Sequence, residues 1–181
     1  PPPGSPLRHP ARVGVCPVHG DLNKANVLLW LDATPQVFLI DFATYRERGH
    51  ALRDLAQVEA EVKFLLMDRE AADTPLGLDY TAERLPVWIA AEDRLATWVA
   101  DPAAGDPGPV RRAYDLIGWV RDQARQVHTN GGGDLPFETE YLVPLLYHTL
   151  RVVGYADVSP VKRVLAVRCA ARITAAFSQP R

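Results

Sequence analysis

The sequence predicts a mainly α-helical chain that carries one small β-hairpin near its N-terminus. Two apolar runs of strand length, residues 27–31 and 37–40, flank the turn-forming stretch 32–36, which suits a five-residue hairpin loop. From residue 50 onward, apolar residues recur at helical spacing between breaks rich in proline and glycine. Hydrophobic residues make up 48% of the 181 residues, so the chain has enough apolar side chains for a packed core.

The beginning of the chain differs in composition from the rest. Residues 1–12 are rich in proline and basic, which is typical of a linker or a disordered start. A short extended stretch is expected over residues 13–18, where valines surround a Cys-Pro pair. The first residues lack the apolar segment of a secretion signal, and no apolar run reaches the roughly 18 residues of a membrane span. We therefore expect a cytoplasmic protein.

Helical spacing predicts five helices. They are expected over residues 50–67, 86–100, 110–127, 137–153 and 159–177, with loops at 101–109 and 129–136 between them. The fourth should bend near Pro144, because proline removes a backbone donor inside a helix. Ser159 is a suitable N-cap for the fifth, followed by Pro160 at the first helical position. This last helix is apolar on most sides, so we expect it to be well buried.

The residues that indicate chemistry lie between positions 19 and 43. Asp21 is followed five residues later by Asn26, and Asp41 follows the predicted hairpin. Transfer of a phosphoryl group from a nucleoside triphosphate needs oxygen ligands for magnesium, commonly carboxylates and an amide. It also needs a carboxylate that takes the proton of the acceptor hydroxyl. The hairpin doubles the chain back, so it can bring Asp41 near Asn26 on what we expect to be a buried apolar mount.

These residues resemble a known family. The stretch HGDLNKAN followed by LIDFA resembles the catalytic and metal-binding motifs of the aminoglycoside phosphotransferase-like branch of the kinase superfamily. Gly20 stands where protein kinases carry arginine, as in that branch, and Ala43 replaces the last glycine of the metal-binding motif. Downstream, GHALRDLA resembles the start of that branch's next helix. The run RDLAQVEAEVKFLL looks like the kinase-like, ternary complex-associated domains of bacterial conflict systems.

The resemblance implies a fold and a division of the chain. Residues 13–178 would form the C-terminal lobe of a protein-kinase-like phosphotransferase. Its parts would be a catalytic loop (19–26), a hairpin (27–40), a metal-binding motif (41–43) and a helical subdomain (50–178). No glycine-rich loop or strand lysine precedes the catalytic loop in this sequence, so the nucleotide-binding N-lobe is absent from it. That lobe would be supplied in cis or by another chain, and the sequence is either a fragment or a natural remnant.

The resemblance also implies roles for individual residues. Asp21 would be the catalytic base, and Asn26 and Asp41 would hold magnesium together with ATP or GTP. His19 and Asp54 would have structural roles in the loop, and Lys24 would be a candidate phosphate contact. Each role has an ordinary structural alternative: a loop-capping Asp, an Asn that satisfies turn backbone, an Asp at a strand end, and a solvated lysine. The joint spacing of Asp21, Asn26 and Asp41 favours the functional interpretation.

The expected function is the acceptor- and metal-binding half of an ATP- or GTP-dependent phosphotransferase. It would move a phosphoryl group to a hydroxyl, most simply that of a small molecule, with helices from residue 84 onward shaping the acceptor pocket. Two alternatives stay open: a pseudokinase-like interaction module in a larger bacterial signalling or conflict-system protein, and a metal-dependent hydrolase. The net charge of −2 argues against nucleic acid or an anionic membrane as partner.

Two further expectations concern packing. The four tryptophans at positions 30, 88, 98 and 119 lie in apolar patterns and are predicted to be core residues. The carboxylates Glu59, Glu61, Glu92, Asp93, Asp115 and Asp122 are predicted to lie on solvated helix faces.

Overall fold

The computed structural model describes residues 11–66, 108–131 and 133–178, together with the isolated helical positions 86, 89, 90, 92 and 93. Most of the Pro-rich start and most of the helix expected over 86–100 lie outside the described residues, as do Trp88 and Trp98. The described part is mainly helical and carries a small two-stranded antiparallel hairpin, so this coarse expectation is confirmed.

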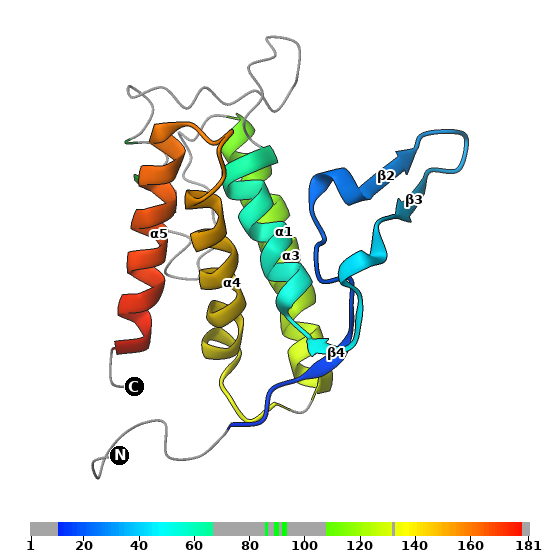
Figure 1. The fold of residues 1–181 in the computed structure, drawn as a ribbon, viewed down its shortest axis with the longest axis horizontal. Helices are drawn as coiled ribbons and strands as arrows, with labels where there is room; N and C mark the ends of the chain where they lie inside the picture. The colour runs from blue at the N-terminus through cyan, green and yellow to red at the C-terminus, as the bar shows by residue number, and fades with distance from the viewer. Residues whose placement is uncertain are drawn as a thin grey trace.

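Four α-helices pack side by side in the described part of the chain (Figure 1). They are α1 (Arg53–Glu61), α3 (Gly108–Gly131), α4 (Phe137–Val153) and α5 (Pro160–Ser178). A π-helical turn, η3 (Val62–Leu66), extends α1. Helix α4 packs against both α1 and α5, while α3 packs against α1 and η3.

The core forms where the apolar stripes of these helices meet. On α3, Ala113, Ile117, Val120 and Ala124 recur at helical spacing and are all buried. Tyr141 and Leu145 of α4 are 0% and 1% exposed and belong to the same cluster. Burying a side chain of this size stabilises the fold by about 1.5–3 kcal/mol, so the stripes hold α1, α3 and α4 together.

Two helices differ from the sequence prediction. Helix α3 runs through residues 129–131, where a loop was expected; there the Thr129 hydroxyl donates to the Arg125 carbonyl at 2.9 Å. Helix α5 was expected to be well buried, but Val164 and Val167 are more than half exposed. Among the described residues, the neighbours of α5 lie on the side that carries Leu165 and Cys169, so Val164 and Val167 on its other side stay exposed. Helix α4 has the predicted limits, with Pro144 inside it.

The strands form two small antiparallel sheets. Strands β2 (Val27–Trp30) and β3 (Gln36–Leu39) make the predicted hairpin, in the register Val27↔Leu39 to Trp30↔Gln36. Strand β1 (Val15–Val18) pairs with β4 (Arg46–His50), a strand that was not predicted from the sequence. At Gly49 of β4, a β-carbon would collide with the Val18 side chain, so glycine lets the two strands approach.

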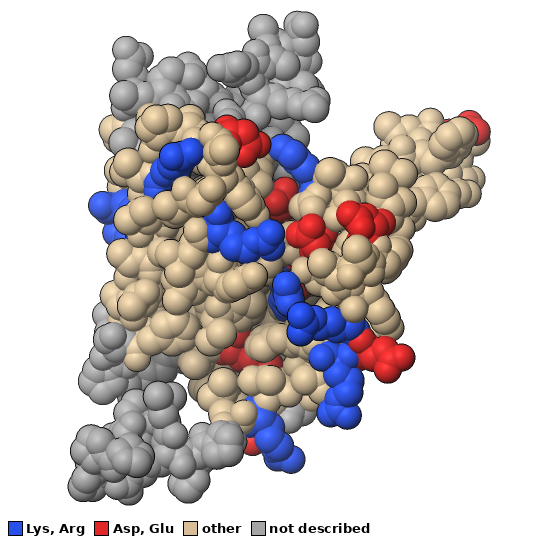
Figure 2. Space-filling view, in the orientation of Figure 1, with Lys and Arg blue, Asp and Glu red and all other residues tan. Residues whose placement is uncertain are grey.

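The hairpin is exposed, contrary to the expectation of a buried mount. Leu29, Trp30 and Leu31 are 64%, 62% and 80% exposed, and Figure 1 shows β2 and β3 projecting away from the helices. Figure 2 shows this projection as an almost uncharged arm that is acidic at its tip; the turn between β2 and β3 contains Asp32. Trp119 of α3 is also 57% exposed, so Trp30 and Trp119 are not core residues.

Glu59 and Glu92, two of the predicted surface carboxylates, are buried instead. Glu59 of α1 is 0% exposed and accepts two hydrogen bonds from Arg121, at 2.7 and 2.9 Å, and one from the Tyr141 hydroxyl at 2.8 Å. The Lys63 ammonium lies 2.7 Å from Glu59 and 3.0 Å from Glu92. Burial by itself would raise the pKa of Glu59, but the charges of Arg121 and Lys63 outweigh it and hold that pKa well below its usual range.

The remaining predicted surface carboxylates behave differently from one another. Glu61 is 7% exposed and therefore also buried. Asp115 and Asp122 of α3 are exposed as predicted, whereas Asp93 is half-buried against Arg172 of α5. Among the described helices, none combines the length and the apolar character that crossing a membrane requires.

Candidate functional site

The segment between β1 and β2 forms a tight loop. Its shape depends on the side-chain amide of Asn23 and on Gly20. One turn of 3-10 helix, η1 (Lys24–Asn26), lies immediately before β2. Asn23 caps this turn, because its side-chain oxygen accepts the Ala25 N–H at 2.8 Å and its carbonyl accepts the Asn26 N–H at 3.1 Å. The loop thus holds Asp21 and Asn26 five residues apart in a defined geometry.

Gly20 is the position at which this loop requires glycine. Its φ is +84°, in the left-handed region that side chains disfavour, and a β-carbon there would collide with the carbonyl oxygen of Thr44. The Thr44 hydroxyl donates to the His19 carbonyl at 3.0 Å. The loop therefore packs backbone to backbone against the short helix η2 (Phe42–Thr44), which follows Asp41.

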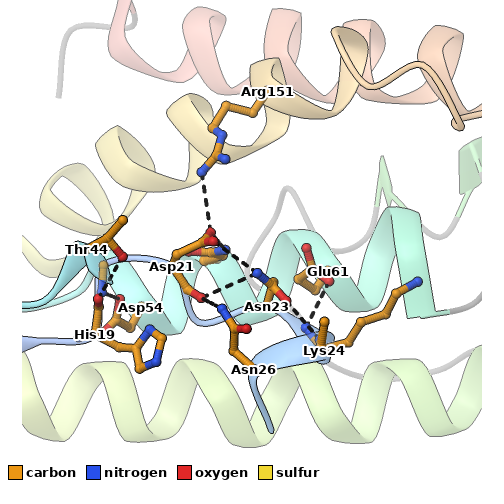
Figure 3. A network of polar contacts seen from close by, with 12 residues as sticks. His19, Asp21, Asn23, Lys24, Asn26, Thr44, Asp54, Glu61 and Arg151 are labelled. Atoms are coloured by element: carbon orange, nitrogen blue, oxygen red, sulfur yellow. Dashed lines mark hydrogen bonds and ion pairs between the residues drawn. The ribbon is translucent and has the colours of Figure 1, made fainter. Parts of the chain in front are cut away.

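Asp54, in the first turn of α1, accepts two backbone hydrogen bonds from the loop. Its carboxylate oxygens take the N–H of His19 at 2.6 Å and the N–H of Gly20 at 2.9 Å (Figure 3). Bonds to a charged acceptor are stronger than neutral ones. These two hydrogen bonds join the loop to the helix bundle. They connect residues that are 35 and 34 positions apart in the sequence.

His19 connects the loop to the end of the hairpin. Its ring is 5% exposed, Nε2 lies 2.8 Å from the Ile40 carbonyl, and the ring centroid lies 4.7 Å from that of Phe42. The Ile40 N–H in turn donates to the Asn26 carbonyl at 3.0 Å. Backbone contacts on both sides of residue 40 thus place Asp41 beside the loop.

Asp21 is held from two sides. Gln57 of α1 donates to Oδ1 at 3.0 Å, and Asn23 donates to Oδ2 at 3.1 Å. Arg151 of α4 approaches the same Oδ1 at 3.8 Å, and Figure 3 shows its side chain reaching from the helix toward Asp21. The Asp21 side chain stays 31% exposed. A fixed, partly open carboxylate is suited to accept a proton or a hydrogen bond from a bound molecule.

Asn26 and Asp41 keep oxygen atoms free. The Asn26 side chain is nearly buried, and its NH₂ donates to the Asp21 carbonyl at 2.8 Å, so its oxygen is the atom left for a ligand. Asp41 adopts the left-handed conformation, with φ 59° and ψ 66°. Its carboxylate is exposed and forms no hydrogen bond or ion pair with the described residues.

A pocket of about 270 Å³ opens beside Asp21. Its walls are formed by residues from the loop, α1, η3, α4 and the segment after α4: Asp21, Asn23, Lys24, Ala25, Glu61, Leu65, Arg151, Tyr155 and Asp157. Glu61 accepts the Lys24 backbone N–H at 3.4 Å, and burial raises the pKa of Glu61. Lys24 is therefore placed on the pocket wall, with three other positions from its own loop.

His148 adds a neutral group close to Asp21. Burial, together with the positive charges of Arg151 and Arg53, lowers its pKa to about 4, while the charge of Asp21 opposes this shift. Its Nε2 and the Oε1 of Gln57 are buried without a hydrogen-bond partner among the described residues. Unpaired buried polar atoms of this kind are costly, so the faces of α1 and α4 near Asp21 carry unmet hydrogen-bonding capacity.

Sequence reasoning named Asp21, Asn26, Asp41, His19, Asp54 and Lys24, but not the partners of Asp21. Gln57 had a local signal, because it lies three residues after Asp54 and therefore shares its helix face. Arg151 had none, because 130 residues separate it from Asp21 along the chain.

The residue types around Asp21 fit a hard dication bound together with phosphates. In the described residues, no three His, Cys, Asp or Glu side chains gather as they would around a resident metal ion. A magnesium site here would instead combine the free oxygens of Asn26 and Asp41 with oxygens from a nucleotide and water, which is how this ion is commonly held. The free amide oxygen of Asn26 and the free carboxylate of Asp41 are compatible with that arrangement.

Comparisons with known proteins give one family. No curated protein and no solved structure matches the chain. A family model, ternary complex associated domain 9, matches residues 6–153, which include the loop, the hairpin and helices α1, α3 and α4. Helix α5 lies beyond the matched range. Because the match spans most of the sequence, the chain belongs to the ternary complex associated domain 9 family.

Proposed function

We propose that this chain is the acceptor- and metal-binding half of an ATP- or GTP-dependent phosphotransferase with a protein-kinase-like C-terminal lobe. The observation that carries the proposal is the position of Asp21. Its carboxylate is oriented by Gln57 and Asn23 at 3.0 and 3.1 Å and faces a pocket large enough for a small hydroxylated molecule. A general base needs this combination of fixed orientation and access.

The reaction would transfer a phosphoryl group to a hydroxyl in the pocket. The acceptor oxygen forms a bond to the terminal phosphorus, and the bond from that phosphorus to the bridging oxygen breaks. The nucleoside diphosphate leaves with the electron pair, and the hydroxyl proton passes to Asp21. Positioning and charge neutralisation contribute most of the rate enhancement in such transfers, so the rigid loop is the main contribution of this chain.

Asn26 and Asp41 would hold the metal. Their side-chain oxygens have no partner among the described residues, and the backbone bonds of Ile40 to Asn26 and His19 fix the segment that carries Asp41. When bound, magnesium would neutralise the phosphate charge. Lys24 lines the pocket beside Asp21 and is a candidate phosphate contact.

The nucleotide would need a second binding surface, in cis or from another chain. The exposed hairpin supports this part of the proposal, because it carries large apolar side chains on both faces next to Asp41. Exposed apolar surfaces of this extent usually mark an interaction site. We expect the 181-residue chain alone to bind ATP no more tightly than about 1 mM, which corresponds to about −4 kcal/mol.

The test compares Asp41→Asn with Asp21→Asn in the full-length protein, with Asp32→Asn in the hairpin turn as matched control. Loss of a carboxylate ligand should weaken magnesium–nucleotide binding in Asp41→Asn. Asp21→Asn should keep that affinity and lose turnover, measured as release of nucleoside diphosphate with a panel of hydroxylated acceptors. Asp32→Asn should change neither. Equal loss of nucleotide affinity in Asp21→Asn and Asp41→Asn would show that the assigned roles are wrong.

A second candidate function is an interaction module without catalysis. The same exposed hairpin favours it, and the family description refers to a complex. The two candidates differ in what Asp21→Asn changes. An interaction module would keep its partner and lose no activity in this variant, whereas the phosphotransferase would lose turnover while keeping the partner.

A further inference from the structure

The Arg151 guanidinium is the feature of the pocket that the proposed chemistry does not use. Arg151 lies on α4, is 34% exposed, and lines the pocket across from the loop. Its only ionic partner among the described residues is Asp21, at 3.8 Å, which is too long for a hydrogen bond. Asp21 is already held by Gln57 and Asn23, so Arg151 is not needed to orient it.

Arginines that have structural roles in this chain look different. Arg121 donates two short hydrogen bonds to Glu59, at 2.7 and 2.9 Å, and Arg12 donates two to Asp134, both at 3.0 Å. Arg151 has no such paired contact. Its guanidinium lies instead 5.9 Å from the Tyr147 ring and 5.8 Å from the Tyr155 ring. Two aromatic neighbours restrict the side chain without occupying its N–H groups.

We propose that Arg151 binds an anionic group of the acceptor, so that the acceptor is a small hydroxylated carboxylate or phosphate. This inference rests on the proposed function, because it assigns the acceptor hydroxyl to Asp21. A guanidinium forms paired hydrogen bonds with either anion, so the two share one recognition chemistry. Since only 3.8 Å separates Asp21 and Arg151, the hydroxyl and the anionic group would lie close together in a small acceptor.

The other charged residues of the pocket limit how many negative charges the acceptor can carry. Asp21, Glu61 and Asp157 line it together with the cations Lys24 and Arg151. The Asp157 side chain is exposed, and Glu61 is buried under the loop. A polyanion would meet these carboxylates, whereas one local negative charge at Arg151 would not. The acceptor should therefore carry a single anionic group.

The experiment uses the 181-residue chain and three probes: D-glycerate, glycerol 3-phosphate and uncharged glycerol. Binding is measured by NMR titration, with the Arg151 Nε–H signal as the local readout and no nucleotide or metal present. We expect glycerate or glycerol 3-phosphate, or both, to shift this signal, and glycerol to leave it unchanged. The better of the two anions identifies the anionic group.

Variants separate recognition by Arg151 from general charge effects. Arg151→Gln should weaken binding of the anionic probe about tenfold, and Arg151→Lys should weaken it less, because lysine keeps the charge but loses the paired geometry. Arg125→Gln, an exposed arginine of α3 that pairs with Glu138, is the matched control and should bind as the wild type does. Preserved amide spectra will show that each variant is folded.

The outcomes bear on this inference and on the proposed function separately. Probe binding that depends on Arg151 supports the inference even if no phosphotransfer is found, since the titration needs neither nucleotide nor turnover. Equal binding by wild type and Arg151→Gln, or no shift with either anion, overturns it. A separate titration with magnesium–ATP covers the remaining case. A shift of the Arg151 signal there, with neither anionic probe causing one, also overturns the inference, because Arg151 would then bind the phosphoryl donor.

Discussion

Asp54 accepts the backbone N–H of His19 at 2.6 Å, although 35 residues separate them. The other oxygen of the same carboxylate accepts the Gly20 N–H at 2.9 Å. One side chain at the start of α1 therefore satisfies two consecutive donors of the loop that carries Asp21. Because the same helix also carries Gln57, α1 positions both the backbone of the loop and its central carboxylate.

Replacing Asp54 with alanine should destabilise the protein. Asp54→Ala would leave the two loop N–H groups without their acceptor, at an expected cost of about 1–3 kcal/mol in free energy of unfolding. Urea denaturation measures this cost, with Asp115→Ala as control, because Asp115 is exposed on α3 and contacts no described partner. A free energy of unfolding in Asp54→Ala equal to that of the wild type would show that the two bonds add nothing to stability.

A β-carbon at position 20 should be poorly tolerated. Gly20→Ala places alanine at a φ of +84° and drives its β-carbon into the Thr44 carbonyl. The left-handed conformation alone costs roughly 1–2 kcal/mol, and the collision adds to it. Gly154→Ala is the matched control, since φ there is −85° and the nearest atom to a built β-carbon is 3.5 Å away. Similar stability of the two variants, measured by thermal melting, would contradict the close approach of the loop to η2.

Breaking the buried ion network should cost more than either change in the loop. Glu59→Ala would leave Arg121 and Lys63 buried without their shared carboxylate, and removal of one partner from a buried pair costs about 3–5 kcal/mol. Glu47→Ala, on the exposed strand β4, should change stability by less than about 0.5 kcal/mol. Chemical denaturation tests both. A Glu59→Ala loss no larger than that of Glu47→Ala would mean that the network does not stabilise the bundle.

His148 should make the protein sensitive to acid. Its pKa is lowered from 6.5 to about 4 in the folded chain, so the unfolded chain binds a proton more readily. Stability from this group is complete above pH 6.5 and is lost as the pH falls from there toward 4. Between pH 7 and pH 5 the loss should be about 2 kcal/mol.

The variant His148→Gln isolates that contribution, because glutamine does not titrate. Comparing the pH dependence of unfolding free energy in wild type and variant removes the contributions of other groups. The variant should lose about 2 kcal/mol less than the wild type between pH 7 and pH 5. Parallel profiles would show that His148 is not held neutral in the fold.

The hairpin shows what patterning can and cannot reveal. Two apolar runs on either side of a five-residue turn were enough to predict β2 and β3, because hairpin pairing depends on residues that are close in the sequence. The same apolar composition indicated burial, which was wrong for Trp30 and its neighbours. Apolar side chains favour burial. Whether they are buried depends on which other helices and strands pack against them.

The carboxylates give the opposite case. Glu59 was expected on a solvated helix face because its charge favours water, yet it is fully buried. Its partners Arg121 and Tyr141 come from two other helices, 62 and 82 residues further along the chain. The periodicity of one helical segment does not show which distant residues will contact it, so the burial of Glu59 could not be deduced from the sequence of α1 alone.

By itself, the sequence determined the mainly helical character, the hairpin, the limits of α4, and the grouping of His19, Asp21, Asn26 and Asp41 within 23 residues. These features depend on local periodicity, turn formation and spacing, which act over a few residues. Only the tertiary structure decided that β4 pairs with β1, that Gln57 orients Asp21, and that Arg151 reaches Asp21. Such contacts form only when helix packing closes long stretches of chain, and no local pattern encodes which distant residues then meet.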